Sequence, residues 1–122
     1  MTAQELYDRI GGNYAEALSR MMMDSFVARL IVKFVDDTSC GDLIAAWDAG
    51  NEEAAFESAH RAKGVCANLA LTDLAALTSQ ICEALRKGND ELRASTNVDA
   101  LVAELKERYG ATREAIAEFA AQ

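Results

Sequence analysis

Hydrophobic residues recur at intervals of three and four along most of this 122-residue chain, which is the spacing of one face of an α-helix. The C-terminal stripe predicts a helix that begins at Thr96. Its apolar side consists of Val98, Leu101, Val102, Leu105, Tyr109, Thr112, Ile116 and Phe119. A polar connection precedes it, and before that connection a helix capped by Thr72 is predicted to end at Gly88. The apolar side of this helix consists of Leu74, Leu77, Thr78, Ile81 and Leu85.

Capping signals divide the start of the chain into shorter helices. Thr2 and Glu5 have the spacing of a capping box and Gly11 supplies a stop, so a first helix is expected over about residues 3–10. Asn13 is the candidate cap of a second segment. A further apolar stripe at helical spacing follows, made of Phe26, Val27, Leu30, Ile31, Phe34 and Val35.

Two more helices are expected in the middle of the chain. Ser39 is the candidate cap of a helix that ends at Gly50, and Asn51 is the candidate cap of a helix that reaches Ala70. The chain contains no proline, the residue that breaks helices most strongly. Single apolar stripes joined by short links predict an all-α fold, an antiparallel four-helix bundle with short additional N-terminal helices, formed as one domain over residues 1–122.

The composition argues against several classes of protein. Hydrophobic residues make up 51% of the chain and charged residues 26%, a globular balance, and no apolar run is long enough to span a bilayer. The formal net charge of −8 would repel a phosphate backbone, so nucleic acid is not an expected partner. The first residues lack the apolar segment of a secretory signal, and we therefore expect a cytoplasmic location.

The chemistry of the chain centres on its only histidine, which lies in the stretch Ala59-His60-Arg61-Ala62-Lys63-Gly64. At about 100° per residue, one side of this helix should be buried. That side consists of Ala55, Ala59, Ala62, Val65, Cys66 and Leu69. His60 falls opposite, among Glu53, Phe56, Glu57, Lys63, Gly64, Ala67 and Leu71. The imidazole should therefore point outward or into a shallow surface groove.

Two neighbours of His60 indicate a functional role. Glycine inside a helix costs about 1 kcal/mol relative to alanine, so Gly64 indicates that open space one turn from the imidazole is needed. Ala67 extends this smooth surface by another turn. Lys63 lies on the same side, where its ammonium could pair with a phosphoryl oxygen carried by the histidine.

These residues resemble the histidine-containing phosphotransfer (Hpt) domain family, of the stand-alone bacterial type. The signature of that family is A-H-x-L-K-G on an exposed helix of a four-helix bundle, and the similarity extends through Ala67-Asn68-Leu69. The sequence departs from the pattern in two places. Ala62 replaces the usual leucine and Ala70 replaces a frequent glycine, while His60 and Lys63 are retained.

The resemblance implies a role in phosphorelay. His60 would accept a phosphoryl group from the aspartate of a response-regulator receiver domain, or from a sensor or hybrid histidine kinase, and pass it to another receiver. Phe56, Arg61, Gly64 and Ala67 would contact the partner. The chain would act without a cofactor, a metal ion or an ATP site of its own, and no phosphate-cradling glycine loop is present. Glu53 and Glu57 would oppose the added charge, with Arg61 and Lys63 as partial compensation, and this balance stays open.

Two other interpretations are compatible with the sequence. The chain could be a helical protein interaction module that is never phosphorylated, with His60 as a simple contact residue. A Cys/His metal site is the weaker alternative, because Cys66 points away from His60 and Cys82 falls near the apolar stripe of the next helix. Cys40, Cys66 and Cys82 are more simply explained as reduced thiols used as small apolar side chains.

Overall fold

The protein is built only from helices, as a computed structural model of all 122 residues describes it. The elements are α1 (Ala3–Ile10), α2 (Tyr14–Met21), α3 (Asp24–Lys33), a 3-10 turn (Phe34–Asp36), α4 (Ser39–Asp48), α5 (Glu52–Asn68), α6 (Thr72–Leu85), α7 (Asp90–Ser95) and α8 (Val98–Ala120). This confirms the predicted all-α class. None of the helices is both long and apolar enough to cross a membrane.

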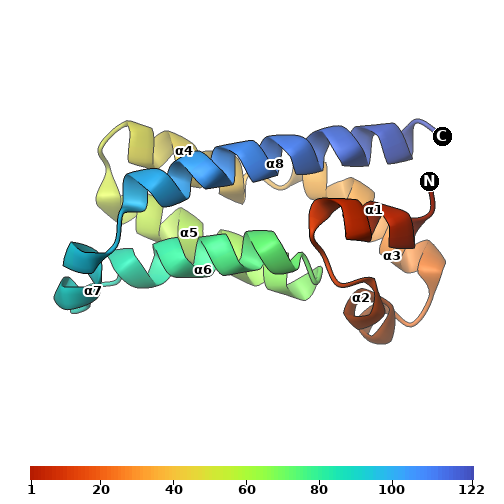
Figure 1. Ribbon diagram of the computed structural model, residues 1–122, viewed down its shortest axis with the longest axis horizontal. Coiled ribbons are helices and arrows are strands. Elements are labelled where there is room, and N and C mark those ends of the chain that lie inside the picture. The colour runs from red at the N-terminus through yellow and green to blue at the C-terminus, as the bar shows by residue number, and fades with distance from the viewer.

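The bundle is formed by α4, α5, α6 and α8. Helix α5 packs against α4 on one side and α6 on the other, and α8 packs along α6 and α4 (Figure 1). The three short N-terminal helices lie at one end of the bundle, where α1 contacts α8, and both chain termini lie at this end. Helix α7 lies at the opposite end. The predicted antiparallel bundle with short N-terminal helices is therefore confirmed.

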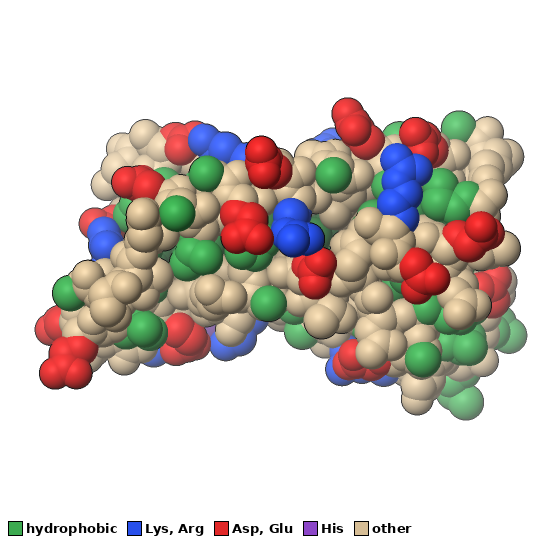
Figure 2. Space-filling model, in the orientation of Figure 1, with side chains coloured by type: hydrophobic (Ala, Val, Ile, Leu, Met, Phe, Trp, Pro, Cys, Tyr) green, Lys and Arg blue, Asp and Glu red, His purple; other side chains and the backbone are tan.

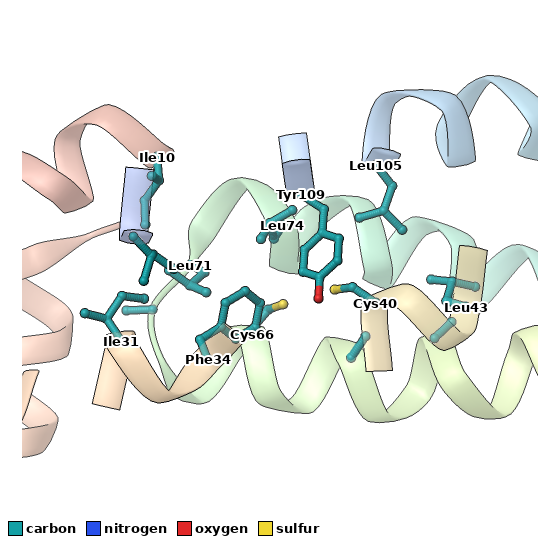
Figure 3. Close-up of a cluster of buried hydrophobic side chains, with 14 of the residues drawn as sticks. Ile10, Ile31, Phe34, Cys40, Leu43, Cys66, Leu71, Leu74, Leu105 and Tyr109 are labelled. Atoms are coloured by element: carbon teal, nitrogen blue, oxygen red, sulfur yellow. The ribbon is translucent and has the colours of Figure 1, made fainter. Parts of the chain in front are cut away.

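One continuous core of 26 buried hydrophobic residues joins the helices other than α7, while Asp, Glu, Lys and Arg side chains are spread over the face drawn in Figure 2. Figure 3 shows the ring of Tyr109 reaching from α8 into the bundle, with the sulfur atoms of Cys40 and Cys66 close to its hydroxyl group. The Tyr109 hydroxyl donates to the backbone oxygen of Asp37 at 3.4 Å. All three cysteines are free and buried, which confirms their expected use as small apolar side chains.

The local capping signals gave the correct starts of several helices. Thr2 forms the full capping box with Glu5, and the side chains of Asn13 and Asn51 accept bonds from the first turns of α2 and α5. Other starts were off by one or two residues. Helix α8 begins at Val98 with Asn97 as its cap instead of at Thr96.

Three further details differ from the sequence-based expectations. The connection before α8 contains the short helix α7, which has no buried residue and hence no apolar stripe to reveal it. Ser39 and Thr72 are the first residues of α4 and α6, and neither helix has a side-chain cap. Helix α3 ends at Lys33, and the last turn of the apolar stripe tightens into the 3-10 turn.

The end of α5 is fastened to the N-terminal helices. The helix ends at Asn68, and Ala70 follows in the left-handed region with φ of 56°, a conformation that suits the glycine often found there in the similar family. The backbone oxygen of Ala70 accepts a hydrogen bond from Asn13 at 2.8 Å, and the Tyr7 hydroxyl donates to Leu69 at 2.8 Å. These long-range bonds fix the C-terminal end of the helix that holds His60.

Candidate functional site

His60 lies on the solvent side of α5, near the middle of the helix. The buried residues of α5 are Ala55, Ser58, Ala59, Ala62 and Cys66. These side chains pack against α4 and α6, and four of the five are alanine or cysteine, so the inner face of the helix is nearly smooth. The expected sidedness is confirmed, because His60 is exposed while its neighbour Ala59 is completely buried.

Lys63, one turn after His60, is held by an ion pair that the sequence analysis missed. Its Nζ lies 3.2 Å from Oε1 of Glu83 on α6. The same carboxylate accepts two bonds from Arg86, with Nε at 3.1 Å from Oε2 and Nη2 at 3.2 Å from Oε1. Hydrogen bonds from Arg86 and from Lys63 lower the pKa of the Glu83 carboxyl. Two cations thus share one carboxylate beside the histidine.

Aromatic contacts connect this ion cluster to the imidazole. The centroids of the Phe56 and His60 rings are 6.2 Å apart, and the Arg86 guanidinium lies 5.2 Å from the centroid of the Phe56 ring, within cation–π distance. Phe56 also lies in a surface groove between the start of α5 and the end of α6. The groove is lined by Glu52, Glu53, Phe56, Glu57, Leu85, Arg86 and Lys87. It has an acidic wall on α5 and a basic wall formed by the two residues that follow α6.

On the other side of His60, the residues of α5 have small side chains and leave the surface open. Gly64 has a helical backbone and is not among the residues with positive φ, and no atom lies within 4 Å of the place where a Cβ would be. Ala67 is exposed, and its backbone oxygen accepts a hydrogen bond at 2.5 Å from Arg20 of α2. Gly64 is therefore not required by the backbone conformation or by close packing.

Two residues that the sequence analysis associated with the imidazole do not point towards it. Arg61 is exposed and directed to α4, where its Nη2 lies 3.4 Å from Asp42 and 3.3 Å from the hydroxyl of Ser58. Leu71, placed by periodicity near the direction of His60, lies beyond the end of α5 and is buried. The expectation for Leu71 was wrong because the helix ends at Asn68 and the chain turns there.

His60 has the Phe56 ring and, one turn away, the Lys63 ammonium as neighbours on α5. No group of three or more His, Cys, Asp or Glu side chains is placed to hold a metal ion anywhere in the chain. An exposed imidazole with a neighbouring ammonium can instead carry an anionic group and offset its charge.

A protein-family model matches about two thirds of the chain. The family model described as Hpt domain matches residues 36–115, which is 80 of the 122 residues. The chain belongs to the Hpt domain family. The match covers α4 to α7 and most of α8, with His60 and Lys63 inside it, and leaves α1 to α3 outside. No curated protein and no solved structure matches the chain at a significant level.

Membership of the Hpt domain family gives the general function. Hpt domains take part in histidine phosphotransfer within the phosphorelays of two-component systems. They are phosphotransfer modules and not kinases, and they interact with response regulators and kinases.

Proposed function

We propose that His60 is the residue of this Hpt domain that carries the phosphoryl group. A neutral imidazole nitrogen attacks the phosphorus of an aspartyl phosphate on a receiver domain, so that an N–P bond forms while the P–O bond to the aspartate breaks. The aspartate leaves as a carboxylate. The same imidazole nitrogen can later act as the leaving group when a second receiver aspartate attacks the phosphorus, so the transfer is reversible.

The observation that carries this proposal is the exposure of the only histidine on the outer face of α5, with a smooth surface beside it. In-line attack requires the donor to approach the imidazole closely. The open positions at Gly64 and Ala67 leave room for a folded receiver domain at this point. Phe56, which lies in the groove, provides an apolar contact on the other side.

Lys63 is proposed as the charge partner of the phosphoryl group. Its ammonium is bound to Glu83, yet the pair is partly exposed, and such pairs contribute only about 0–1 kcal/mol. Lys63 can therefore turn to the phosphoryl oxygens at small cost. Arg61 lies on the α4 side of the helix and suits contact with the partner better than neutralisation of the phosphoryl group. Glu53 and Glu57 lie on the groove and are suited to recognition of a basic residue of the partner.

A labelling experiment tests the proposal. The protein is incubated with a receiver domain whose aspartate has been phosphorylated with radioactive acetyl phosphate. We expect label on this chain that is lost in acid and stable in alkali, and no label on His60→Gln, which should keep the wild-type fold because His60 is exposed. Lys63→Gln is the matched control, since it keeps the imidazole and should be labelled more slowly. Equal labelling of His60→Gln, or no labelling of the wild type by any receiver of its organism, would contradict the proposal.

A further inference from the structure

Glu83 is placed to compete with a phosphoryl group for the same lysine. Its Oε1 atom lies 3.2 Å from Lys63 Nζ, and Lys63 is the cation one turn from His60. A carboxylate that holds this ammonium lowers its availability to any anion on the imidazole. If no other cation bound Glu83, release of Lys63 would leave the carboxylate without a partner in a partly buried position.

Arg86 removes this penalty. Its guanidinium binds both oxygens of Glu83, at 3.1 and 3.2 Å, in the bidentate arrangement that arginine forms with carboxylates. The bonds do not depend on Lys63, because Arg86 follows directly after the end of α6 and lies only three residues from Glu83. The stacking of Arg86 on Phe56 fixes the guanidinium on the side of the bundle that holds His60.

From this arrangement we infer that Arg86 and Glu83 are positioning residues. Together they control how easily Lys63 leaves Glu83 to bind the phosphoryl group on His60. Before transfer, Glu83 on α6 holds the Lys63 ammonium of α5. When the phosphoryl group arrives, Lys63 exchanges the carboxylate for a phosphoryl oxygen, and Arg86 alone continues to satisfy Glu83. The inference rests on the proposed role of His60 and adds the control of its charge partner.

Substitutions of Glu83 and Arg86 should have opposite effects. Glu83→Gln removes the competitor, so Lys63 should bind the phosphoryl group more readily. Arg86→Gln leaves Glu83 with Lys63 as its only partner, so the lysine should be held back. Both effects should be about two- to fivefold in the equilibrium between aspartyl phosphate and phosphohistidine, the range expected for exposed ion pairs.

The decisive measurement is a double-substitution cycle. Wild type, Glu83→Gln, Arg86→Gln and the double variant are each equilibrated with one phosphorylated receiver domain, and the fraction of label on His60 is measured. In the double variant the loss caused by Arg86→Gln should disappear, because Arg86 acts only through Glu83. Lys87→Gln is the matched control, since it removes a neighbouring cation of the same groove that has no ion pair in the structure.

Each outcome has a distinct meaning. If Arg86→Gln lowers the phosphohistidine fraction equally in the presence and absence of Glu83, Arg86 contacts the phosphoryl group or the receiver directly and the inference is overturned. The same holds if Glu83→Gln lowers the fraction, or if Lys87→Gln has the effect of Arg86→Gln. None of these results changes the role of His60, which depends on whether the wild type is labelled and His60→Gln is not.

Discussion

Gly64 allows stability and function to be separated by two substitutions at one position. The residue lies inside α5 with a helical backbone, and a Cβ added there meets no atom within 4 Å. Replacement by alanine should therefore cause no clash and no backbone strain. The expected effect is the helix propensity difference, about 0.5–1 kcal/mol in favour of alanine.

The corresponding shift of the melting temperature follows from the size of the chain. An unfolding entropy of about 2.1 cal/mol/K per residue gives roughly 0.26 kcal/mol/K for 122 residues. A gain of about 1 kcal/mol then raises the melting temperature by about 4 °C. Gly64→Gln should keep most of this gain, because glutamine is also a good helix former.

Transfer should respond differently from stability. The glutamine side chain would stand one turn from His60 on the surface where the receiver must approach, so Gly64→Gln should slow phosphotransfer by at least about tenfold while Gly64→Ala has a smaller effect. Calorimetric melting curves and rapid-quench transfer rates on both variants provide the test. A well-folded Gly64→Gln protein that transfers at the wild-type rate would refute the role of the glycine in access, and a lower melting temperature for Gly64→Ala would refute the assignment of an unstrained open position.

Two further predictions concern stability. Met22 has φ of 72° and is 86% exposed. Met22→Gly should relieve a backbone strain of about 1–2 kcal/mol, offset by about 0.5–1 kcal/mol of chain entropy. Met22→Ala should give no gain in the unfolding free energy measured with urea. Burial raises the pKa of Tyr7 to about 12 from 10.0. The stability that the neutral Tyr7 hydroxyl gives to the folded state is therefore complete below pH 10 and falls by up to about 2–3 kcal/mol as the pH rises towards 12. The difference in unfolding free energy between wild type and Tyr7→Phe should therefore shrink over this range, and a constant difference would contradict the shift.

The parts of the structure that could be predicted from the sequence are those that depend on nearby residues. Caps such as Thr2 and Asn51 act within one turn, and the outward direction of His60 follows from the alanines on the opposite side of the same helix. The pairing of Lys63 with Glu83 could not be predicted in this way. It depends on the rotation and register of α6 against α5, which are set by packing between residues far apart in sequence.

Arg61 illustrates the same limit. Its position next to His60 in the sequence suggested a cation near the phosphoryl group, but a step of one residue turns the side chain by about 100° towards α4. The short helix α7 was missed for a different reason. It has no buried residue, so no hydrophobic pattern distinguishes it from a polar connection.

The division of α5 into two faces explains how a reactive residue can be placed on the central helix of a small bundle. Ala55, Ala59 and Ala62 are completely buried and allow α4 and α6 to pack closely on one side of α5. Substitutions of these alanines by larger residues should overpack the core and cost about 1–3 kcal/mol. On the outer face, the requirements of phosphotransfer can determine the residue type at His60 and Gly64, because neither residue contributes to the core. Lys63 serves both the packing of the bundle and the proposed chemistry. Its pair with Glu83 joins α5 to α6 at the point where the proposed phosphoryl group on His60 is neutralised.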